Sequence, residues 1–159
     1  MRIGVLSDTH DRLPMIDAAM DRFRAVGVDT LVHAGDVISP FAAKRLAQFP
    51  GTLHVVYGNN DGERAGLNGV LPQIQDGPIF LDLGGRRVLV HHALDWCHDD
   101  QLEQADVVVA GHTHEVEVRS HGKKLMVNPG ECCGWVTGRC TIAVVDLDRL
   151  EAEIIELST

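Results

Sequence analysis

Five short polar clusters interrupt the chain, and each one follows a run of apolar residues. They are Asp8-Thr9-His10, Gly35-Asp36, Gly58-Asn59-Asn60-Asp61, His91-His92 and Gly111-His112-Thr113-His114. Short apolar runs bounded by polar residues are typical of buried strands. In open sheets, the residues that follow the carboxyl ends of parallel strands share one edge. The spacing therefore predicts that these side chains, far apart in sequence, meet at one edge of a sheet.

The first third of the chain alternates predicted strands with predicted helices. Apolar runs at residues 3–6, 30–33 and 53–57 indicate strands. Residues 14–26 and 40–48 each begin with a proline at a first-turn position and indicate helices. This order favours parallel strands joined by right-handed crossovers.

The rest of the chain is richer in predicted strands. They cover residues 79–83, 87–90, 107–110, 116–119, 124–127, 141–146 and 154–157, with a hairpin signal at Gly84-Gly85. A helix is expected over residues 94–104, and a short one within residues 67–75. We expect an α/β protein in which two sheets pack face to face with helices outside, as one domain spanning residues 1–159.

The polar clusters carry the side chains that bind divalent metal ions. Carboxylate and amide oxygens and imidazole nitrogens suit hard and borderline cations. Asp8 and His10 are two residues apart, as are His112 and His114, so on extended backbone each pair points to one side. For a single cluster, a hydrogen-bonded turn is the better interpretation, because Asp and Asn favour turns. All five clusters in this order favour a metal site.

The order of the clusters also resembles a known superfamily. D-x-H, then G-D, then G-N-x-D, then a lone His, then G-H-x-H is similar to the pattern of the calcineurin-like metallophosphoesterases. Residues 58–64 and 128–134 resemble the small, single-domain phosphodiesterase branch of that superfamily in bacteria and archaea. The resemblance runs from Ile3 to about Val145. It implies a two-sheet sandwich flanked by helices, in four layers α/β/β/α, which agrees with the fold expected above.

The resemblance implies a metal-binding role for seven matching residues: Asp8, His10, Asp36, Asn59, His92, His112 and His114. By this match, Asp8, His10 and His114 bind a first ion, Asn59, His92 and His112 bind a second, and Asp36 bridges both. The lone His is ambiguous because His91 and His92 adjoin. Ending the preceding strand at Val90 favours His92 as the ligand and leaves His91 as the alternative.

Two neighbouring divalent ions can lower the pKa of a shared water towards about 7, and the resulting hydroxide can attack phosphorus in line. We therefore expect a metal-dependent phosphodiesterase with two divalent metal ions as its cofactors. The resemblance favours Mn, with Fe, Zn, Co, Ni or Mg as alternatives. The expected substrate is a small phosphodiester.

Asn60 is a departure from the family pattern. Many members have a histidine at this position, which protonates the leaving group, whereas an amide cannot transfer a proton at neutral pH. This difference favours phosphodiesters with good leaving groups over alkyl monoesters. Asn60 and Asp61 are expected to support the reaction from behind the metal ligands.

The alternative function is a scaffold or protein-binding module that has kept the fold and lost catalysis, as the retromer subunit of this superfamily has. The full set of seven ligand-type residues favours an enzyme. A formal net charge of -9 argues against stable binding to nucleic acid or to an anionic membrane surface. A homodimer is compatible with a chain of this size.

Residues outside the clusters are expected to be structural. The four cysteines lack a C-x-x-C pair, and no apolar run resembles a signal peptide, so we expect a cytoplasmic protein with reduced thiols. Cys132 and Cys133 are expected to be buried packing residues. Trp96 and Trp135 are expected in the core or at an interface. Lone histidines are expected to be structural: His33, His54, His98 and His121.

Overall fold

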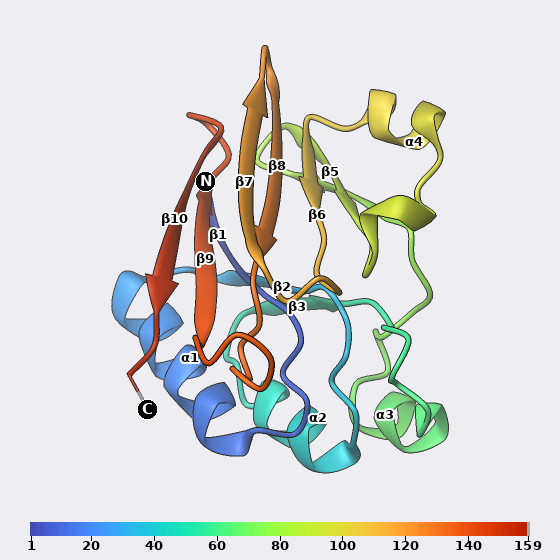
Figure 1. Ribbon diagram of the computed structural model, residues 1–159, viewed down its shortest axis with the longest axis vertical. Coiled ribbons are helices and arrows are strands. Elements are labelled where there is room, and N and C mark those ends of the chain that lie inside the picture. The colour runs from blue at the N-terminus through green and yellow to red at the C-terminus, as the bar shows by residue number, and fades with distance from the viewer. Residues whose placement is uncertain (159) are drawn as a thin grey trace.

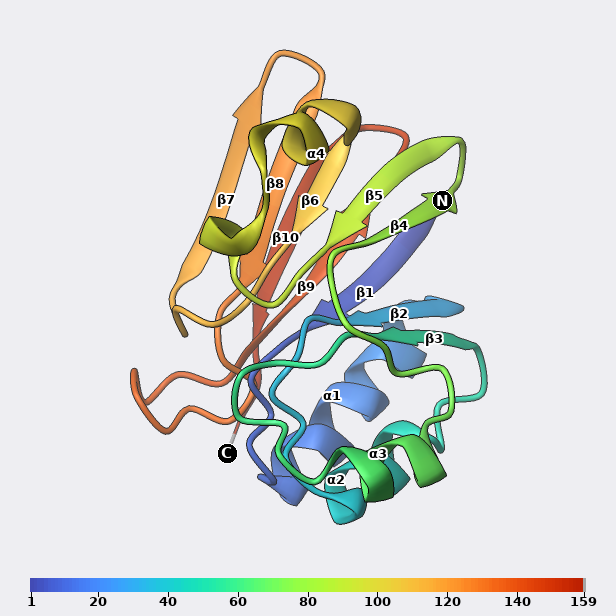
Figure 2. The same cartoon turned by 90° about the vertical axis from the view of Figure 1, so that its right-hand side faces the viewer.

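The fold consists of two five-stranded sheets packed face to face, with helices on both outer sides (Figures 1 and 2). The computed structural model describes residues 1–158, and Thr159, the last residue of the predicted domain, lies outside this range. Helices α1 to α3 cover the first sheet, and α4 lies over the second (Figure 2). The predicted α/β/β/α sandwich is confirmed.

The first sheet combines parallel and antiparallel strands in the order β10-β9-β1-β2-β3. Strands β1, β2 and β3 are parallel, and β9 lies antiparallel to β1. The bounds of the strands are β1 Arg2–Leu6, β2 Thr30–His33, β3 Thr52–Val55, β9 Thr141–Asp146 and β10 Glu151–Glu156. The helices that cover this sheet are α1 Leu13–Val26, α2 Pro40–Leu46 and α3 Arg64–Val70. Strand β1 therefore lies at the centre of the sheet, and its carboxyl end points towards the first polar cluster.

The second sheet has the order β4-β5-β6-β8-β7. Strands β5, β6 and β8 are parallel, and β4 and β7 pair antiparallel at the two edges. The strand bounds are β4 Ile79–Leu83, β5 Arg86–Val90, β6 Val107–Val109, β7 Val116–His121 and β8 Lys124–Pro129. The predicted hairpin joins β4 to β5, and both Gly84 and Gly85 have positive φ, as a tight hairpin turn requires.

Apolar side chains fill the space between the sheets and the space under the helices. Valines from both sheets, including Val5 and Val107, form the core between the sheets. Phe23 of α1 packs with Leu31 in the core between the first sheet and its helices. Among residues 1–158, no helix is long and apolar enough to span a membrane.

Three predicted elements differ from the structure. The short helix expected within residues 67–75 begins earlier, as α3 Arg64–Val70. The predicted helix over residues 94–104 is divided into a 3-10 turn, η1 Leu94–Trp96, and α4 Asp99–Gln104, because Cys97 and His98 have extended backbone. The Gln101 side chain accepts a hydrogen bond from the backbone N–H of His98 and so fixes the new helix start. Strand β10 begins earlier than predicted because Ala152 and Ile154 pack onto the core between the sheets.

Gly4 lies in strand β1 on the face that packs against α1, and the packing there leaves no space for a side chain. A Cβ at this position would lie 2.6 Å from the Phe23 ring and would also collide with Leu31. Gly4→Ala should therefore lower the free energy of unfolding by about 1–3 kcal/mol, as overpacked cores do. Urea unfolding measures the loss.

Gly69→Ala is the matched control, because a Cβ at Gly69 meets nothing within 4 Å. Since Gly69 lies inside α3, alanine should stabilise the protein by about 0.5–1 kcal/mol. Equal effects at the two positions would contradict the packing described for β1.

Candidate metal centre

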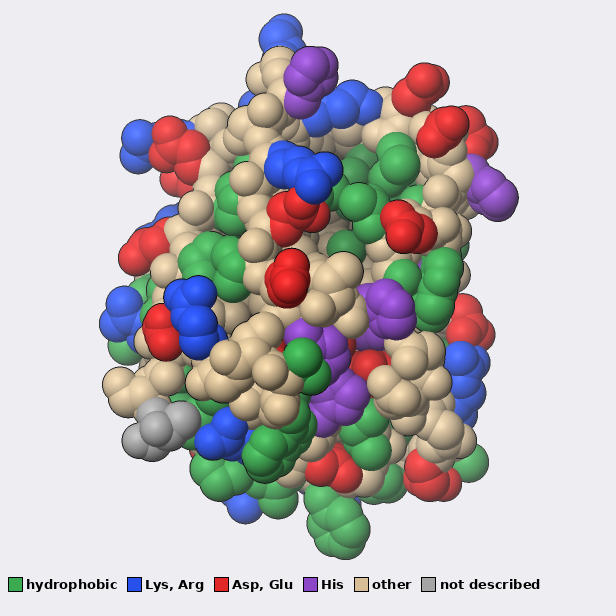
Figure 3. All heavy atoms as spheres, viewed as in Figure 1, with side chains coloured by type: hydrophobic (Ala, Val, Ile, Leu, Met, Phe, Trp, Pro, Cys, Tyr) green, Lys and Arg blue, Asp and Glu red, His purple; other side chains and the backbone are tan. Residues whose placement is uncertain are grey.

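The loops after β1, β2, β3, β5 and β6 converge where the two sheets meet, and they carry the predicted ligands. Figure 3 shows histidine side chains gathered on this face of the molecule, with acidic side chains beside them. The backbone is left-handed at Asp8, His10, Asp36, His112 and His114, with φ between 38° and 70°. Such φ values are uncommon outside glycine and cost about 1–3 kcal/mol each, so their concentration here indicates a functional site.

Asp8, His10 and His114 lie together on one side of the cluster, which we call the first half-site. His114 Nε2 lies 3.4 Å from Asp8 Oδ1, and His10 Nε2 lies 3.7 Å from the same oxygen. Asp8 is fully buried. Its other oxygen, Oδ2, accepts a hydrogen bond of 3.1 Å from the backbone N–H of His112. This bond ties the loop after β1 in the first sheet to the loop after β6 in the second.

Asn59, His92 and His112 form the second half-site. Asn59 Oδ1 lies 2.9 Å from His92 Nε2 and 2.9 Å from His112 Nδ1. The two imidazole rings meet edge to face, with centroids 5.1 Å apart. One amide oxygen and two imidazole nitrogens thus face one another, as ligands of a single ion would.

Asp36 lies between the half-sites. Its Oδ2 is 3.3 Å from His10 Nε2 and 3.4 Å from His92 Nε2. Asn60 donates to both oxygens, through its backbone N–H at 2.9 Å and its side-chain amide at 2.7 Å. Burial raises the pKa of Asp36, but the hydrogen bonds from His92 and Asn60 outweigh burial and hold the pKa below its ordinary value. Asp36 is therefore ionised at neutral pH.

The donor atoms fit a divalent cation. Among the side chains of residues 1–158, Asp8 Oδ1 and His10 Nε2 are buried without a hydrogen-bond partner. Ligand atoms of Asp8, His10 and Asp36 lie within 4.8 Å of one another. An unsatisfied buried polar group costs about 1–3 kcal/mol, and a cation held between these atoms would remove that cost. The structure therefore has a charged, preformed cluster of candidate metal ligands.

His92, rather than His91, points into the cluster. The His92 ring donates through Nδ1 to the carbonyl oxygen of Ala34 at 2.7 Å, which leaves Nε2 facing Asp36 and Asn59. His91 Nδ1 instead accepts a hydrogen bond from the backbone N–H of His92 at 2.8 Å. The second histidine of the pair is thus the one positioned to bind metal.

Asp61 fixes the loops that carry the ligands. It is buried and accepts hydrogen bonds from the backbone N–H groups of Asp36 at 3.0 Å, Gly58 at 2.7 Å and Ile38 at 2.7 Å. These bonds join the loop after β2 to the loop after β3. Asp61 acts on the cluster through its neighbours, as expected for a supporting residue.

His33 is buried behind the cluster, as a structural histidine. Its Nδ1 accepts a hydrogen bond of 3.1 Å from the backbone N–H of Gly35, and its Nε2 lies 3.1 Å from Thr9 Oγ1. Burial lowers the pKa of His33 to about 4, so the ring is neutral. Through Gly35, it helps to hold the residue that precedes Asp36.

Glu131 is the functional residue that the sequence did not reveal. Its carboxylate is fully buried and lies 2.7 Å from His114 Nδ1, an arrangement that orients the imidazole and leaves Nε2 for metal. The Thr137 backbone and hydroxyl and the Trp135 backbone also donate to it. Burial raises the pKa of Glu131, but these hydrogen bonds and His114 outweigh burial and lower it to about 2. The stretch 128–134 resembles the family, but no pattern within it assigns Glu131 a role.

Cys133 lies beside the first half-site. Its sulfur is within 4.8 Å of the ligand nitrogens of His10 and His114 and donates to Glu131 Oε2 at 3.1 Å. Cys132 and Cys133 are both fully buried, as expected for packing residues. Burial raises the pKa of both thiols.

Trp96 and Trp135 are exposed on either side of the cluster, so neither belongs to the core, and their place at an interface stays a prediction. Trp96 is 47% exposed, and its ring centroid lies 5.4 Å from that of His112. Trp135 is 63% exposed, and its indole N–H donates to the carbonyl oxygen of His10 at 3.3 Å. Both rings therefore lie beside the metal centre.

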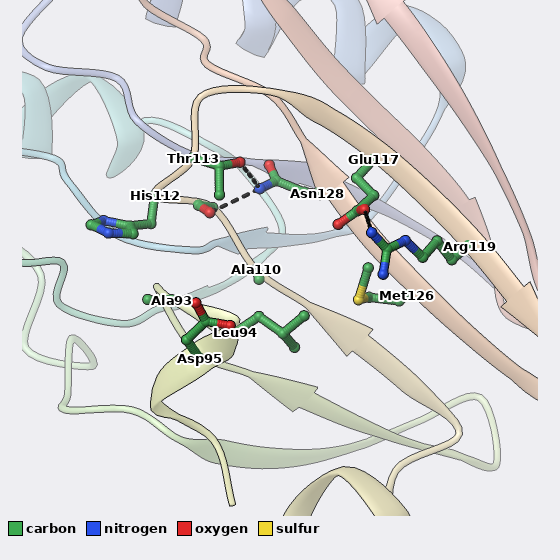
Figure 4. Close-up of a pocket in the computed structure, with 11 residues that line it drawn as sticks. Ala93, Leu94, Asp95, Ala110, His112, Thr113, Glu117, Arg119, Met126 and Asn128 are labelled. Carbon is green, nitrogen blue, oxygen red and sulfur yellow. Dashed lines mark hydrogen bonds and ion pairs between the residues drawn. The ribbon is translucent and has the colours of Figure 1, made fainter. Parts of the chain in front are cut away.

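A cavity of about 210 Å³ opens beside His112 (Figure 4). Residues of η1, the loop after β6, and strands β7 and β8 line it. Asn128 closes one side, where its amide donates to the carbonyl oxygen of Gly111 at 2.8 Å and to Thr113 Oγ1 at 3.0 Å. The cavity and the second half-site therefore share His112.

Comparison with known proteins identifies the family. Residues 1–150 match the model of the calcineurin-like phosphoesterase superfamily domain. The chain belongs to this superfamily. It is also 38% identical to a phosphodiesterase from Methanocaldococcus jannaschii, over 99% of both chains.

Solved structures of phosphoesterases have the same fold. An archaeal phosphodiesterase superposes with a TM-score of 0.86 at 36% identity, over 99% of this chain and 100% of that one. Yfce, a phosphoesterase from E. coli, superposes with a TM-score of 0.76 at 20% identity, over 99% of this chain and 100% of that one. At that identity, the second match concerns the fold alone.

Glu131 should make the stability of the metal-free protein depend on pH. Its folded-state pKa of about 2 is below the ordinary value of 4.5, so its stabilising effect is complete above pH 4.5 and disappears as the pH falls towards 2. The unfolding free energy of the wild type should exceed that of Glu131→Gln at neutral pH, and the difference should shrink over this acid range. Urea unfolding at several pH values measures it.

Glu153→Gln is the control, because Glu153 is an exposed residue of β10. A wild-type advantage over Glu131→Gln that stays constant from neutral pH to the acid limit would refute the charged, hydrogen-bonded state of Glu131.

Proposed function

We infer that this chain is a phosphodiesterase that uses two divalent metal ions. One observation carries the inference: a single oxygen of Asp36 lies 3.3 Å from His10 Nε2 and 3.4 Å from His92 Nε2. One carboxylate thus faces both half-sites, as a bridging ligand must. The name of the Methanocaldococcus relative and its 38% identity over 99% of both chains support the same activity.

Each half-site would hold one ion. Asp8, His10 and His114 would bind the first, Asn59, His92 and His112 the second, and Asp36 both. When bound, the two ions supply a water of lowered pKa as nucleophile and positive charge for the phosphate oxygens. The oxygen and nitrogen donors suit Mn(II), which we propose as the resident metal, with Fe, Zn, Co, Ni or Mg as alternatives.

Neighbouring residues prepare the ligands for this role. The carbonyl oxygen of Ala34 and the carboxylate of Glu131 each accept the Nδ1 proton of a histidine, so His92 and His114 present Nε2 lone pairs. Asn60 holds both oxygens of Asp36 in place. A site preorganised in this way needs little rearrangement when metal or substrate binds, so the free-energy cost of rearrangement is small.

Asn60 also supports the preference for diesters. Its side-chain amide donates to Asp36 Oδ2 at 2.7 Å, and an amide cannot act as an acid at neutral pH. Alkyl monoesters, whose leaving groups need a proton, should therefore react slowly. A small phosphodiester with a good leaving group is the substrate that this site suits best.

The setting we propose is the cytoplasm, where the buried thiols of Cys132, Cys133 and Cys140 stay reduced. The alternative function, a scaffold without catalysis, has less support. A scaffold has no need for strained backbone at five of the predicted ligand positions. It also has no need for buried oxygen and nitrogen atoms that lack a hydrogen-bond partner.

Metal dependence tests the proposal. Chelator-stripped protein should not hydrolyse bis(nitrophenyl) phosphate, and added Mn(II) should restore the reaction. Asp36→Asn should lower kcat/KM by about 100-fold or more, because several kcal/mol of charge stabilisation depend on the bridging carboxylate. Release of nitrophenolate measures both effects.

Asp21→Asn is the control, since Asp21 is exposed on α1 and pairs with Arg24. Activity that survives complete chelation, or that is undiminished in Asp36→Asn, would exclude the two-metal mechanism.

A further inference from the structure

The cavity beside His112 has the size of one ring-shaped group. Its volume is about 210 Å³, whereas sites for whole drug-sized ligands measure about 300–1,000 Å³. Figure 4 shows His112 at one end and the Glu117–Arg119 pair at the other, with Leu94 between them. A phosphate held at the metal centre would therefore have the cavity directly beside it.

The inner wall of the cavity is apolar. Ala93, Leu94, Ala110 and Met126 line it, and Leu94 and Met126 pack against a small core formed by Leu89 and its neighbours. Apolar walls with a few polar groups favour a ring over a solvated chain, because burying the ring removes apolar surface from water. The wall therefore favours a substrate group that is apolar and matches the shape of the cavity.

The charged residues of the cavity leave it negative. Asp95 and Glu117 contribute carboxylates, and among the described residues that line the cavity Arg119 carries the one full positive charge. Arg119 is paired with Glu117, so these two charges cancel. The Asp95 carboxylate therefore gives the cavity a net negative charge. It would repel an anionic substituent and would accept hydrogen bonds from hydroxyl or amino groups.

Asn128, another polar residue of the lining, cannot compensate. The Asn128 amide donates to Gly111 and Thr113, and its Oδ1 accepts from the backbone N–H of Gly130 at 3.0 Å. Asn128 therefore stabilises the loop that carries His112 and has no donor left for an anion.

We propose that this cavity binds one ester group of the substrate, a ring that bears hydroxyl or amino groups and carries no negative charge. The proposal rests on the phosphodiesterase function, because it requires the phosphate to lie at the metal centre. It narrows the substrate to diesters with at least one neutral or cationic ring alcohol. Diesters with a second phosphate or a carboxylate on that ring should bind more weakly.

Three competitors with neutral, positive and negative ring substituents test the proposal. They are methyl benzyl phosphodiesters whose rings carry a hydroxymethyl, an aminomethyl or a carboxylate group, each measured as an inhibitor of bis(nitrophenyl) phosphate hydrolysis. Methyl is too small to fill the cavity, so one ring is tested at a time. The carboxylate compound should bind about two- to fivefold more weakly than the hydroxymethyl compound, because its charge meets the like charge of Asp95, which is exposed and therefore screened.

Three variants assign the effect to the cavity. Asp95→Asn should abolish most of the discrimination against the carboxylate. Glu117→Gln should make the carboxylate compound bind more tightly than the hydroxymethyl compound, because Arg119 then loses its partner. Met126→Trp should fill the cavity and weaken all three ring competitors, while inhibition by dimethyl phosphate stays unchanged. Thermal unfolding verifies that each variant is folded.

Asp99→Asn is the matched control, since it makes the same change of charge in α4, away from the lining residues. If the wild type hydrolyses the chromogenic diester but Asp95→Asn and Glu117→Gln rank the competitors as the wild type does, or Met126→Trp binds them as tightly, the cavity proposal is overturned and the phosphodiesterase function stands. If no diester is hydrolysed with any metal, both fail.

Discussion

The position of one carboxylate organises this site. Asp36 follows β2 in the first sheet, yet it faces His92 from the second sheet as well as His10 from its own. That placement depends on close approach of the loops: a Cβ at Gly58 would collide with the carboxylate. A buried carboxylate needs positive charge or hydrogen-bond donors around it. The two-sheet fold thus places the Asp36 carboxylate between two imidazoles, an arrangement that a bound divalent cation would stabilise.

Hydrogen bonds from outside the ligand set keep that arrangement in place. Asp61 holds the loops after β2 and β3 together, and Glu131 holds the loop after β8 against His114. These carboxylates compensate for the left-handed backbone at the ligand positions. The cavity beside His112 is formed by other segments: η1, the loop after β6, and strands β7 and β8.

Much of the fold and of the candidate site could be predicted from sequence, because these parts depend on local patterns. Apolar runs located the strands, and the end of β5 at Val90 indicated His92 in place of His91. The rest depends on contacts between distant segments. Glu131 gains its role from a loop that folds around it, and the Trp96 ring is exposed because the chain turns at Cys97 and His98 instead of continuing as a helix. The cavity likewise depends on how η1 lies against β7 and β8.

Anomalous X-ray scattering from crystals soaked in Mn(II) tests the central claim most directly. Two peaks are predicted for each chain, one among Asp8, His10 and His114 and one among Asn59, His92 and His112, with Asp36 in contact with both. A single peak, or two peaks of which only one contacts Asp36, would contradict the account of a shared carboxylate between two ions.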